Sequence, residues 1–245
     1  MDHPQWRDVA LVGAFWNCAD RAEALLTEMR PWFKRIAIAV QESPDDTLER
    51  VRAIADVAIP DKWHGHGNIS FQKAINEAKT PWCLLISDDE MPDEMLLAGM
   101  QEMVSKADLD HLDGWWFHFH STIDGFEFTR EQDNHLRLFR TRWGWPTTIH
   151  SRPMIPMQRT GFWPHGKGCI SHDRTLDEMM SDYLRRYRIG QGNKNWEAHN
   201  KRMMLTACRA IAERRGADYV TAFPWWKDVR SLTGLDLEGG DHGGA

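Results

Sequence analysis

Three adjacent acidic residues, Asp88, Asp89 and Glu90, follow the short apolar run Trp82–Ile86. Crowded carboxylates repel one another, so three of them at the end of a buried strand are costly unless a positive charge lies beside them. A hard divalent cation that takes oxygen ligands and is shared with substrate phosphates meets this need. The structural alternative is that the acids cap a helix beginning near Pro92, because acidic side chains are favoured in a first helical turn.

The elements that must position these acids alternate regularly through the first half of the chain. Compact apolar runs predict buried strands, and apolar residues at helical spacing predict helices between them. The alternation is typical of an α/β fold with a mostly parallel sheet that is covered on both faces. The strands are expected at Val9–Phe15, Ile36–Val40, Val57–Ile59 and in the run that ends at Asp88, and the helices at about Asp20–Met29, Asp46–Asp56 and Ile69–Ala78.

Polar residues stand at the carboxyl ends of several of these strands. Asn17 follows the first strand, Glu42 follows the second, and the three acids follow the fourth. Ligands of parallel sheets bind beyond the carboxyl ends of the strands, so these side chains are expected at one edge of the sheet. Their agreement favours a ligand site over a simple helix cap.

The second half of the chain has a different pattern. A helix precedes alternating residues that predict antiparallel strands with a turn at Asp124-Gly125, and two strongly helical segments follow. The tail from Gly234 is rich in glycine and is expected to be disordered. The helices are expected at Met95–Met103, Leu176–Ile189 and Glu197–Arg214, and the strands at Gly114–His120, Phe126–Phe128 and Leu136–Arg140.

Composition limits the class of protein. The 245 residues are 42% hydrophobic and carry a formal charge of −6, so one sizeable core can form and no overall basic field attracts polyanions. The segment 137–159 differs locally, since it holds five arginines and no acid and can bind phosphate. The cysteines lie far apart, which favours free thiols in a reducing compartment. No apolar run approaches the ~20 residues of a membrane span, so a cytoplasmic protein is expected.

Thirteen tryptophans are a second unusual feature. Burial in the core is the ordinary explanation, because tryptophan is usually well buried. The other explanation is an aromatic platform on which a sugar ring or a base stacks. The clustered tryptophans are Trp115 and Trp116, Trp143 and Trp145, Trp163, and Trp225 and Trp226.

The ordered set of segments over about residues 9–190 resembles family 2 of the inverting glycosyltransferases, which has the GT-A fold. The resemblance is greatest to the subgroup with a single compact domain and acceptors such as lipopolysaccharide cores. Each motif is short, and the order and spacing of the set carry the likeness. The motifs are Leu11–Asn17, Ala39–Thr47, Ser70–Ile75, Leu85–Glu90, Leu136–Arg140 followed by Ile149-His150, and Cys169–His172 followed by Arg186-Tyr187.

The resemblance implies one GT-A domain at residues 1–234 and a flexible tail at 235–245. A nucleotide-sugar-binding half would occupy about 9–110, and an acceptor-binding half with the C-terminal helices about 111–234. The implied reaction moves a sugar from a nucleotide-sugar, most often a UDP-sugar, to an acceptor hydroxyl with inversion, and Mn²⁺ or Mg²⁺ neutralises the diphosphate. The acceptor could be a glycan, a lipid-linked saccharide, a protein or a modified base in DNA. The sequence identifies neither the sugar nor the oligomeric state.

The same resemblance assigns roles around the acids. Asp89 would be the direct metal ligand, Asp88 would contact the ribose or the metal, and Glu90 would support the ligands from behind. His172 would complete the coordination, and an ordinary loop histidine is the alternative. The residues implied in binding the nucleotide-sugar are Asn17, Glu42, Gln72, Lys73 and Arg137, with Arg140 as a further candidate.

Structural alternatives remain open for two of these basic residues. Lys73 would equally suit a solvated helix face, and Arg140 would suit a structural ion pair. Arg137 and Arg140 belong to the same alternating strand, so one of them could contact the diphosphate.

The general base is the least defined residue. Ser151 stands where the family has a Glu after the motif histidine, and Asn17-Cys18 stands where it has Asn-Glu. The turn after the second strand also lacks the family's glycine. A carboxylate must nevertheless reach the acceptor hydroxyl. The candidates are Asp113, Glu127, Asp133 and Asp173, of which Asp133 and Asp173 are preferred.

Two other functions are alternatives to a metal-dependent glycosyltransferase. A nucleotidyltransferase would need glycine and lysine in the loop Phe15–Asp20, which has neither. A non-catalytic glycan or protein binder on a transferase-like scaffold would fit the tryptophans and Ser151. The pairs His64/His66 and His118/His120 could each face one side of a strand, but no third and fourth zinc ligands accompany them at suitable spacing.

Overall fold

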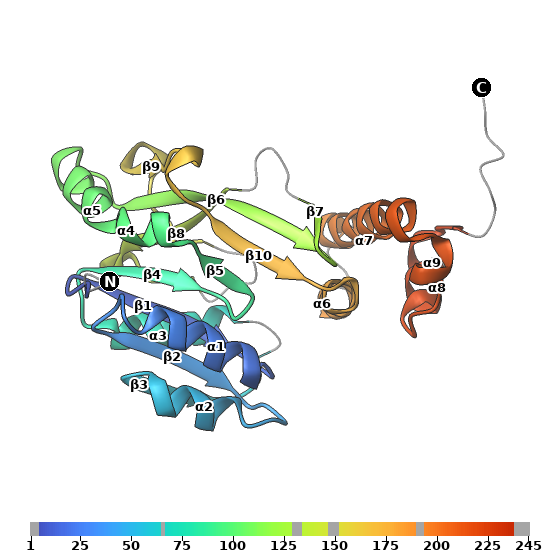
Figure 1. Ribbon diagram of the computed structural model, residues 1–245, viewed down its shortest axis with the longest axis horizontal. Coiled ribbons are helices and arrows are strands. Elements are labelled where there is room, and N and C mark those ends of the chain that lie inside the picture. The colour runs from blue at the N-terminus through green and yellow to red at the C-terminus, as the bar shows by residue number, and fades with distance from the viewer. Residues whose placement is uncertain (1–4, 65–66, 129–133, 147–151, 190–193, 238–245) are drawn as a thin grey trace. The chain divides into compact units, whose positions relative to one another are not determined.

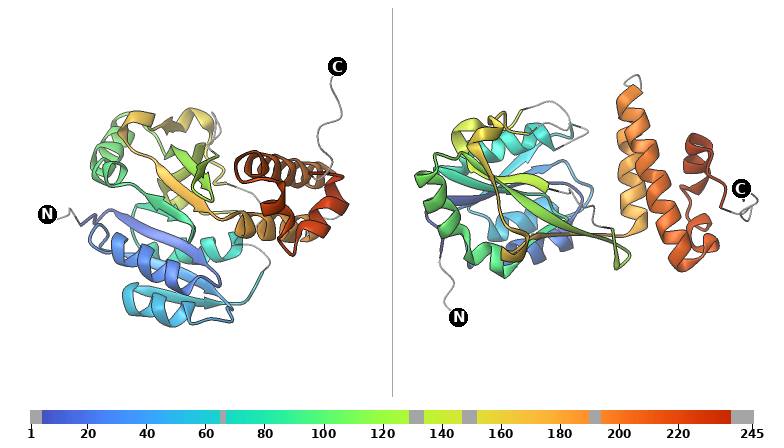
Figure 2. Two further views of the ribbon diagram at one scale, coloured as in Figure 1. Left: turned by 45° about the vertical axis from the view of Figure 1, so that its right-hand side comes forward. Right: turned by 90° about the horizontal axis from the view of Figure 1, so that it is seen from above.

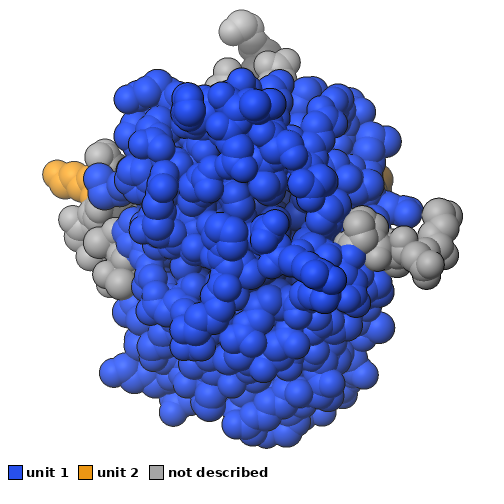
Figure 3. All heavy atoms as spheres, turned by 90° about the vertical axis from the view of Figure 1, so that its left-hand side faces the viewer, with its two compact units in different colours: residues 1–120, 129–172 blue, residues 121–128, 173–245 orange. Residues whose placement is uncertain are grey.

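The computed structural model describes residues 5–64, 67–128, 134–146, 152–189 and 194–237. The chain divides into two compact units (Figure 3). Unit 1 comprises Met1–His120 and Thr129–His172, and unit 2 comprises Ser121–Phe128 and Asp173–Ala245. The single domain at 1–234 and its two halves therefore remain predictions.

The first half of unit 1 contains four parallel strands in the order β3-β2-β1-β4. The residues of β1, β2 and β4 are almost entirely buried because both faces of the sheet are covered there, which explains their unbroken apolar runs, whereas the edge strand β3 is only partly buried. The register places Gly13 of β1 beside Ile38 of β2 and Ile86 of β4. The expected α/β fold is confirmed, with β1 at Val9–Phe15, β2 at Ile36–Gln41, β3 at Val57–Asp61 and β4 at Trp82–Ile86.

Three helices cover the parallel strands. Helices α1 (Ala19–Met29) and α2 (Thr47–Ile54) lie on one face, and α3 (Asn68–Ala78) lies on the other (Figure 1). Because strand side chains alternate between faces, Leu11 packs in the core beneath α1 whereas Val12 packs in the core beneath α3. The three predicted helices are confirmed, each starting or ending within two residues of its expected limits.

Mainly antiparallel strands extend the sheet beyond β4, although β9 pairs with β6 in parallel. Along the chain they are β5 (Glu90–Pro92), β6 (Gly114–Ile123), β7 (Phe126–Glu127), β8 (Asn134–Arg140), β9 (Thr160–Phe162) and β10 (Ile170–Arg174). The order continues from β4 through β8, β6 and β10 to β5, while β7 and β9 pair with β6. The predicted antiparallel strands are confirmed, and β6 runs three residues beyond its expected end at His120.

The segment after the acids differs from the prediction. The fourth strand ends at Ile86 rather than Asp88, and Glu90 begins the three-residue strand β5, which pairs with β10. The helix expected near Pro92 begins at Glu94, where the Asp93 carboxylate accepts a hydrogen bond of 2.7 Å from the Leu96 N–H. Asp93 is therefore the helix cap, and the three acids before it are not.

The single helix expected at Met95–Met103 is two helices. Helix α4 spans Glu94–Ala98 and α5 spans Met100–Leu109, with Gly99 between them. Gly99 has a ψ of −7°, above the value of a regular α-helix, and the regular helix is interrupted there. Short 3₁₀ turns occur at Thr141–Trp143 (η1), Met157–Arg159 (η2) and His165–Lys167 (η3).

Asp93 also ties the start of β10 to α4. Its second carboxylate oxygen accepts a hydrogen bond of 2.9 Å from the Cys169 N–H, and its own N–H donates to the Cys169 carbonyl at 3.0 Å. Gly168 allows this approach, because its φ is 110° and a Cβ there would lie 2.4 Å from the Leu96 nitrogen. The polypeptide entering β10 is thus held against the end of β5.

Unit 2 is mainly helical. It contains α6 (Leu176–Ile189), α7 (Lys194–Arg215), α8 (Ala217–Thr221) and α9 (Trp226–Thr233), and Figure 2 shows α6 and α7 side by side. Both long helices were expected. Residues 238–245 of the expected tail lie outside the described residues. No helix in the described ranges combines the length and the apolar character needed to cross a membrane. The cytoplasmic location remains a prediction.

Candidate functional site

The turn after β4 and strand β10 bring Asp89 and His172 together. The His172 Nε2 atom lies 3.1 Å from Asp89 Oδ2. The β5–β10 ladder causes this contact, because Glu90 pairs with His172 in the register and Asp89 is the preceding residue. The side chain of Asp89 is 11% exposed and that of His172 is 26% exposed, so the pair can be reached from solvent. These are two of the three predicted metal ligands.

The chemistry of this pair fits a divalent cation such as Mn²⁺ or Mg²⁺. A carboxylate oxygen and an imidazole nitrogen are suitable donors for Mn²⁺, and carboxylates suit Mg²⁺. Their separation is close to the ~3 Å between adjacent donors around a six-coordinate ion with bonds of about 2.1 Å. In the described part of the chain, no group of three or more His, Cys, Asp or Glu side chains could hold a metal. Further ligands would come from phosphate oxygens and water.

Glu90, the third predicted metal ligand, is directed to Arg137. Arg137 Nε donates to Glu90 Oε2 at 3.0 Å, and Arg137 Nη2 donates to Oε1. The Ser87 N–H also donates to Oε2 at 3.1 Å. The Arg137 guanidinium lies 5.3 Å from the centre of the Phe119 ring. Glu90 and Arg137 therefore form one buried ion pair behind the Asp89–His172 pair.

Asp88 has a different partner, which the sequence did not indicate. Arg21 of α1 places Nη2 2.7 Å from Asp88 Oδ2. Burial raises the pKa of the neighbouring Cys18 thiol, and the Asp88 carboxylate raises it further. Cys18 is consequently an uncharged thiol, and the charge of Asp88 is balanced by Arg21.

The loops after β1 and β2 are joined by hydrogen bonds. The Asn17 N–H donates to Ser43 Oγ at 2.9 Å, and Asn17 has a positive φ of 49°. The Trp16 indole N–H donates to the Glu42 carbonyl at 3.0 Å. The two predicted nucleotide contacts, Asn17 and Glu42, are therefore held close together at the carboxyl ends of neighbouring strands.

Asp45 contributes to the same connection. Its carboxylate accepts hydrogen bonds from the Ala19 N–H at 3.0 Å and from Thr47 Oγ1 at 2.6 Å. Partial burial opposes ionisation of Asp45, but the hydrogen bonds from Thr47 and Ala19 outweigh it and hold the pKa below its ordinary value. The carboxylate thus fixes the start of α1 as an ionised acceptor.

Trp16 also stacks on Trp63, which follows β3. The ring centroids are 4.3 Å apart and the planes meet at 29°. The indoles thus form an aromatic surface beside Asn17 and Glu42. This pair was not among the tryptophan clusters singled out in the sequence, because its members lie far apart in the chain.

Asp61, the last residue of β3, joins several side chains at this edge of the sheet. It was not among the residues predicted from sequence. Its buried carboxylate contacts Lys73 Nζ at 2.5 Å, Ser70 Oγ at 2.9 Å and His64 Nε2 at 3.0 Å. Burial opposes ionisation, but the hydrogen bonds from Lys73, Ser70 and His64 prevail and lower the pKa of Asp61. The predicted nucleotide contact Lys73 is therefore already paired with a carboxylate.

Asp61 was overlooked because the expected end of the third strand came too early in the chain. The third strand was expected to end at Ile59, which made Asp61 a loop residue rather than a polar strand end.

Gln72, another predicted contact, connects α3 to a loop: it donates to Asn76 Oδ1 at 2.7 Å and accepts from the Trp145 N–H. Gln72 thus has a structural role in positioning Trp145.

The candidates for the general base lie in different surroundings. Asp173, on β10, accepts a hydrogen bond of 2.7 Å from Thr122 Oγ1. Asp113 is buried and paired with arginines, and Glu127 is exposed on β7. Asp133 lies outside the described residues, as do His150 and Ser151. The assignment of a base to Asp173 or Asp133 therefore remains a prediction.

The histidine pairs do not assemble a zinc site in the described ranges. His64 contacts Asp61, and His66 lies outside them. His118 stacks on His165 with ring centroids 4.0 Å apart. No set of four ligands accompanies either histidine there.

No family model matches the sequence, and no curated protein matches it. Solved structures do match the fold. A mannosyltransferase from Pyrobaculum calidifontis, PcManGT, in complex with GDP-Man and Mn²⁺, superposes with a TM-score of 0.51 at 12% identity over 96% of this chain and 86% of that one. TarS of S. aureus superposes with a TM-score of 0.50 at 11% identity over 88% of this chain. This chain spans only 44% of the length of that TarS structure.

These matches are to GT-A glycosyltransferases, and the chain has the GT-A fold. The fold expected from the order of the sequence motifs is confirmed. Identities of 11% and 12% support the fold alone, so the residue roles described above are not carried over from either protein.

Proposed function

We propose that the chain is a metal-dependent glycosyltransferase of family 2 type, which moves a sugar from a nucleoside-diphosphate sugar to an acceptor hydroxyl with inversion. The observation that carries this proposal is the Asp89–His172 pair, located beyond the carboxyl end of β4 in a GT-A fold. Ligands of parallel sheets bind at such ends. PcManGT was solved with a nucleotide-sugar and Mn²⁺, which supports a donor and an ion of this kind.

Asp89 and His172 would hold the ion, and Mn²⁺ and Mg²⁺ both fit the donors. When bound, the ion would neutralise charge that develops on the departing nucleoside diphosphate. Asp89 is prepared for this role, because the β5–β10 ladder sets its position before any ligand arrives. The Glu90–Arg137 ion pair stabilises the same ladder from the buried side.

The other end of the donor would lie against the loops after β1, β2 and β3. The Trp16–Trp63 stack offers an aromatic face to a nucleobase, and Asn17 and Glu42 lie beside it. Lys73 is partly exposed at this edge and is held in place by its ion pair with Asp61. A UDP-sugar is our first choice of donor, and Asp173 is our first choice of base for the acceptor hydroxyl.

The test is replacement of Asp89 by Asn, which keeps the size of the side chain and removes its charge. We expect Mn²⁺ affinity in the presence of UDP, measured by calorimetry, to fall at least tenfold, and release of UDP from a UDP-sugar to fall with it. Asp110→Asn, at an exposed carboxylate after α5, is the matched control and should change neither quantity. Undiminished Mn²⁺ binding and sugar transfer in the Asp89→Asn variant would contradict the proposal.

A further inference from the structure

The tryptophan clusters of the sequence divide into buried and partly buried residues in the structure. Trp115 packs edge to face on Trp163 in the core beneath α1, and the two are 3% and 4% exposed. Trp116 is only partly buried and packs against the core beneath α3, because it points to the opposite face of β6. The proposed transferase reaction does not use Trp116.

Strand β9 places the ring of Phe162 on that of Trp116. In the parallel pairing of β9 with β6 these two residues are register partners, so their side chains point to the same face. The ring centroids are 5.8 Å apart and the planes meet at 17°. The Trp116 indole N–H donates to Thr160 Oγ1 at 3.1 Å, which fixes the Trp116 ring. Phe162 is 57% exposed and therefore presents its ring to solvent on a fixed support.

A second pair of stacked rings follows on the same strand. His118 is two residues beyond Trp116 in the regular pairing of β6 with β8, so it points to the same face. Its ring stacks on that of His165 in η3, with centroids 4.0 Å apart and planes at 26°. His165 is exposed, whereas His118 is partly buried. Each outer ring thus lies on an inner ring that belongs to β6.

Arg152 brings a positive charge to the same face. Its guanidinium carbon lies 4.8 Å from the centre of the Trp116 ring, and the residue is exposed. No carboxylate among the described residues forms an ion pair with it. We define Trp116, His118, Arg152, Phe162 and His165 as the β6 platform. Contacts or neighbouring strand positions link all of its members, so they share one surface.

The chain that forms the β6 platform carries no acidic residue. The sequence between Asp133 and Asp173 contains no Asp or Glu, and neither does β6. Other arginines of this stretch are not part of the platform, because carboxylates already hold them. Arg137 pairs with Glu90, Arg140 with Asp108, and Arg142 and Arg159 with Asp113.

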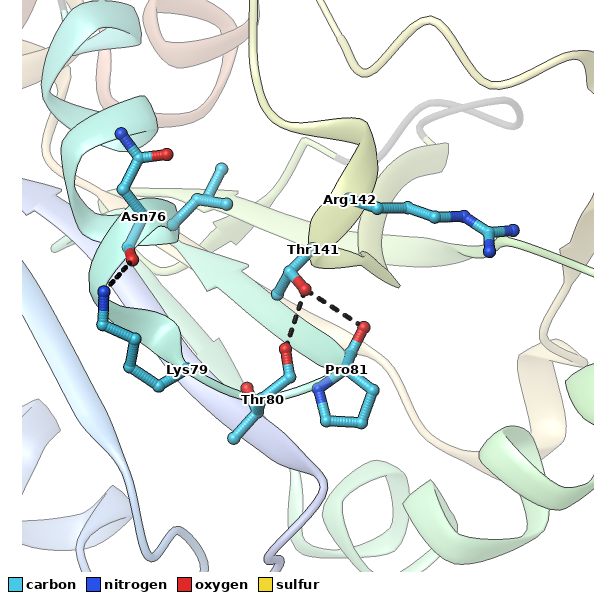
Figure 4. Close-up of a pocket in the computed structure, with 7 residues that line it drawn as sticks. Asn76, Lys79, Thr80, Pro81, Thr141 and Arg142 are labelled. Carbon is cyan, nitrogen blue, oxygen red and sulfur yellow. Dashed lines mark hydrogen bonds between the residues drawn. The ribbon is translucent and has the colours of Figure 1, made fainter.

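A hollow of about 460 Å³ next to the amino end of β4 is a weaker candidate for a ligand site (Figure 4). Lys79 is paired with Glu77 at 3.6 Å, and the Thr141 hydroxyl donates to the Thr80 carbonyl at 2.7 Å. Its polar groups are thus used within the protein, and no aromatic ring lines it. The lining residues are Ile75, Asn76, Lys79, Thr80, Pro81, Thr141 and Arg142.

The chemistry of the β6 platform matches that of a saccharide. A pyranose has a face of C–H groups that packs on an aromatic ring, and its hydroxyl groups need hydrogen-bond partners. Phe162 offers the ring, and Arg152 and His165 offer polar atoms beside it. The rings are held by their partners before any ligand arrives, so little conformational entropy is lost on binding. The positive charge without nearby acids favours a saccharide that carries carboxylates.

The β6 platform is separate from the Asp89–His172 pair. The His172 ring lies edge-on to the Phe119 ring, with centroids 6.1 Å apart. Phe119 packs in the core beneath α1 and points to the opposite face of β6 from His118, as adjacent strand residues do. Within unit 1, the platform and the ring of His172 therefore lie on opposite faces of β6.

We propose that the β6 platform binds an acidic oligosaccharide. One sugar ring stacks on Phe162, the next lies against His165, and Arg152 pairs with a carboxylate of the saccharide. The inner rings that support this stack are two residues apart on β6, which is ~6.6 Å, and this spacing is comparable with the length of one sugar unit. The proposal goes beyond the transferase reaction and does not depend on it.

The test measures binding of tetragalacturonate by calorimetry without Mn²⁺ or nucleotide, with the neutral maltotetraose as a second probe. We expect tetragalacturonate to bind more tightly than maltotetraose. Phe162→Ala should weaken tetragalacturonate binding by about two-fold to about ten-fold, whereas Phe162→Tyr, which keeps the ring, should retain it. Arg152→Gln should weaken tetragalacturonate binding by about two-fold to about five-fold and leave maltotetraose binding unchanged.

Two variants are matched controls that should bind as the wild type does. Leu109→Ala removes an exposed apolar side chain on α5, and Arg52→Gln removes an exposed charge on α2.

Three results would overturn the proposal. The first is no tetragalacturonate binding at millimolar concentration by protein that circular dichroism shows to be folded. The second is equal affinity of the wild type for tetragalacturonate and maltotetraose. The third is tetragalacturonate binding that Phe162→Ala leaves unchanged, since a general anion surface needs no ring. None of these readouts involves Mn²⁺ or sugar transfer, so failure here is distinguishable from failure of the proposed reaction.

Discussion

His172 and Asp89 are separated by 83 positions in the chain, yet their side chains meet at 3.1 Å. The antiparallel ladder between β5 and β10 places them together, because Glu90 is the register partner of His172. The acid beside it and the histidine therefore form one feature of the fold, which depends on the pairing of two strands that lie far apart in the chain.

We expect His172→Ala to weaken Mn²⁺ binding in the presence of UDP by roughly tenfold or more, because one of two protein donors is lost. Calorimetric titration with Mn²⁺ measures the effect. His111→Ala, which removes an exposed histidine after α5, is the control and should bind Mn²⁺ as the wild type does. Equal affinities in all three proteins would exclude His172 as a ligand.

We expect Glu90→Gln to lower the free energy of unfolding by about 3–5 kcal/mol, since Arg137 would be left as a buried charge without its carboxylate. The side chains are 5% and 12% exposed for Glu90 and Arg137 respectively, so solvent screens the pair little. Urea denaturation gives the value. The double variant Glu90→Leu/Arg137→Met should be destabilised less than Glu90→Gln, and the opposite order would contradict this explanation.

Asp61 should make stability depend on pH in the acid range. Because Lys73, Ser70 and His64 lower its pKa in the folded protein, Asp61 binds protons more tightly in the unfolded chain. Its contribution is therefore present above the unfolded pKa of about 3.9 and is lost as pH falls through the lower folded pKa. Asp61→Asn should flatten the loss of stability between about pH 4 and more acid conditions, as measured by urea denaturation across pH. An unchanged acid limb would show that other carboxylates dominate.

The cysteines should react slowly with iodoacetamide at about pH 8. Burial, aided by the Asp93 carboxylate, raises the pKa of Cys169 to about 11, so little thiolate is present. Burial also raises the pKa of Cys18, Cys83 and Cys208. Mass spectrometry should find Cys169 modified first, because it is the most accessible, and all four modified rapidly after unfolding in urea. Rapid labelling of Cys18 in the folded protein would contradict its burial.

Most of the parallel half could be predicted from sequence, because strands buried on both faces are unbroken apolar runs and the helices between them have clear spacing. Val9–Phe15 was identified to the residue. Strand β5 could not be recognised, since three residues carry no periodicity and its pairing with β10 depends on distant contacts.

Residues of the candidate site could be predicted from sequence only where they belong to a motif or where a polar side chain directly follows a predicted strand. The family resemblance implied Asp89 and His172 as metal ligands, which remains a prediction, and the structure brings their side chains together. Asp61 was overlooked because Pro60 made β3 look shorter than it is. The ion-pair partners of the predicted residues could not be predicted, because they lie far away in the chain. Arg21 pairs with Asp88, and Arg137 pairs with Glu90, only in the folded protein.

Asp93 connects the two segments that carry the Asp89–His172 pair. One oxygen of this carboxylate holds the first turn of α4, and the other holds Cys169 three residues before His172. Asp93 contacts neither Asp89 nor His172, yet it connects the two segments that carry them and so fixes the distance between the two side chains. We expect variation at Asp93 in related chains to change the spacing of the two side chains, and with it the affinity for the ion proposed there, while both donor side chains stay intact.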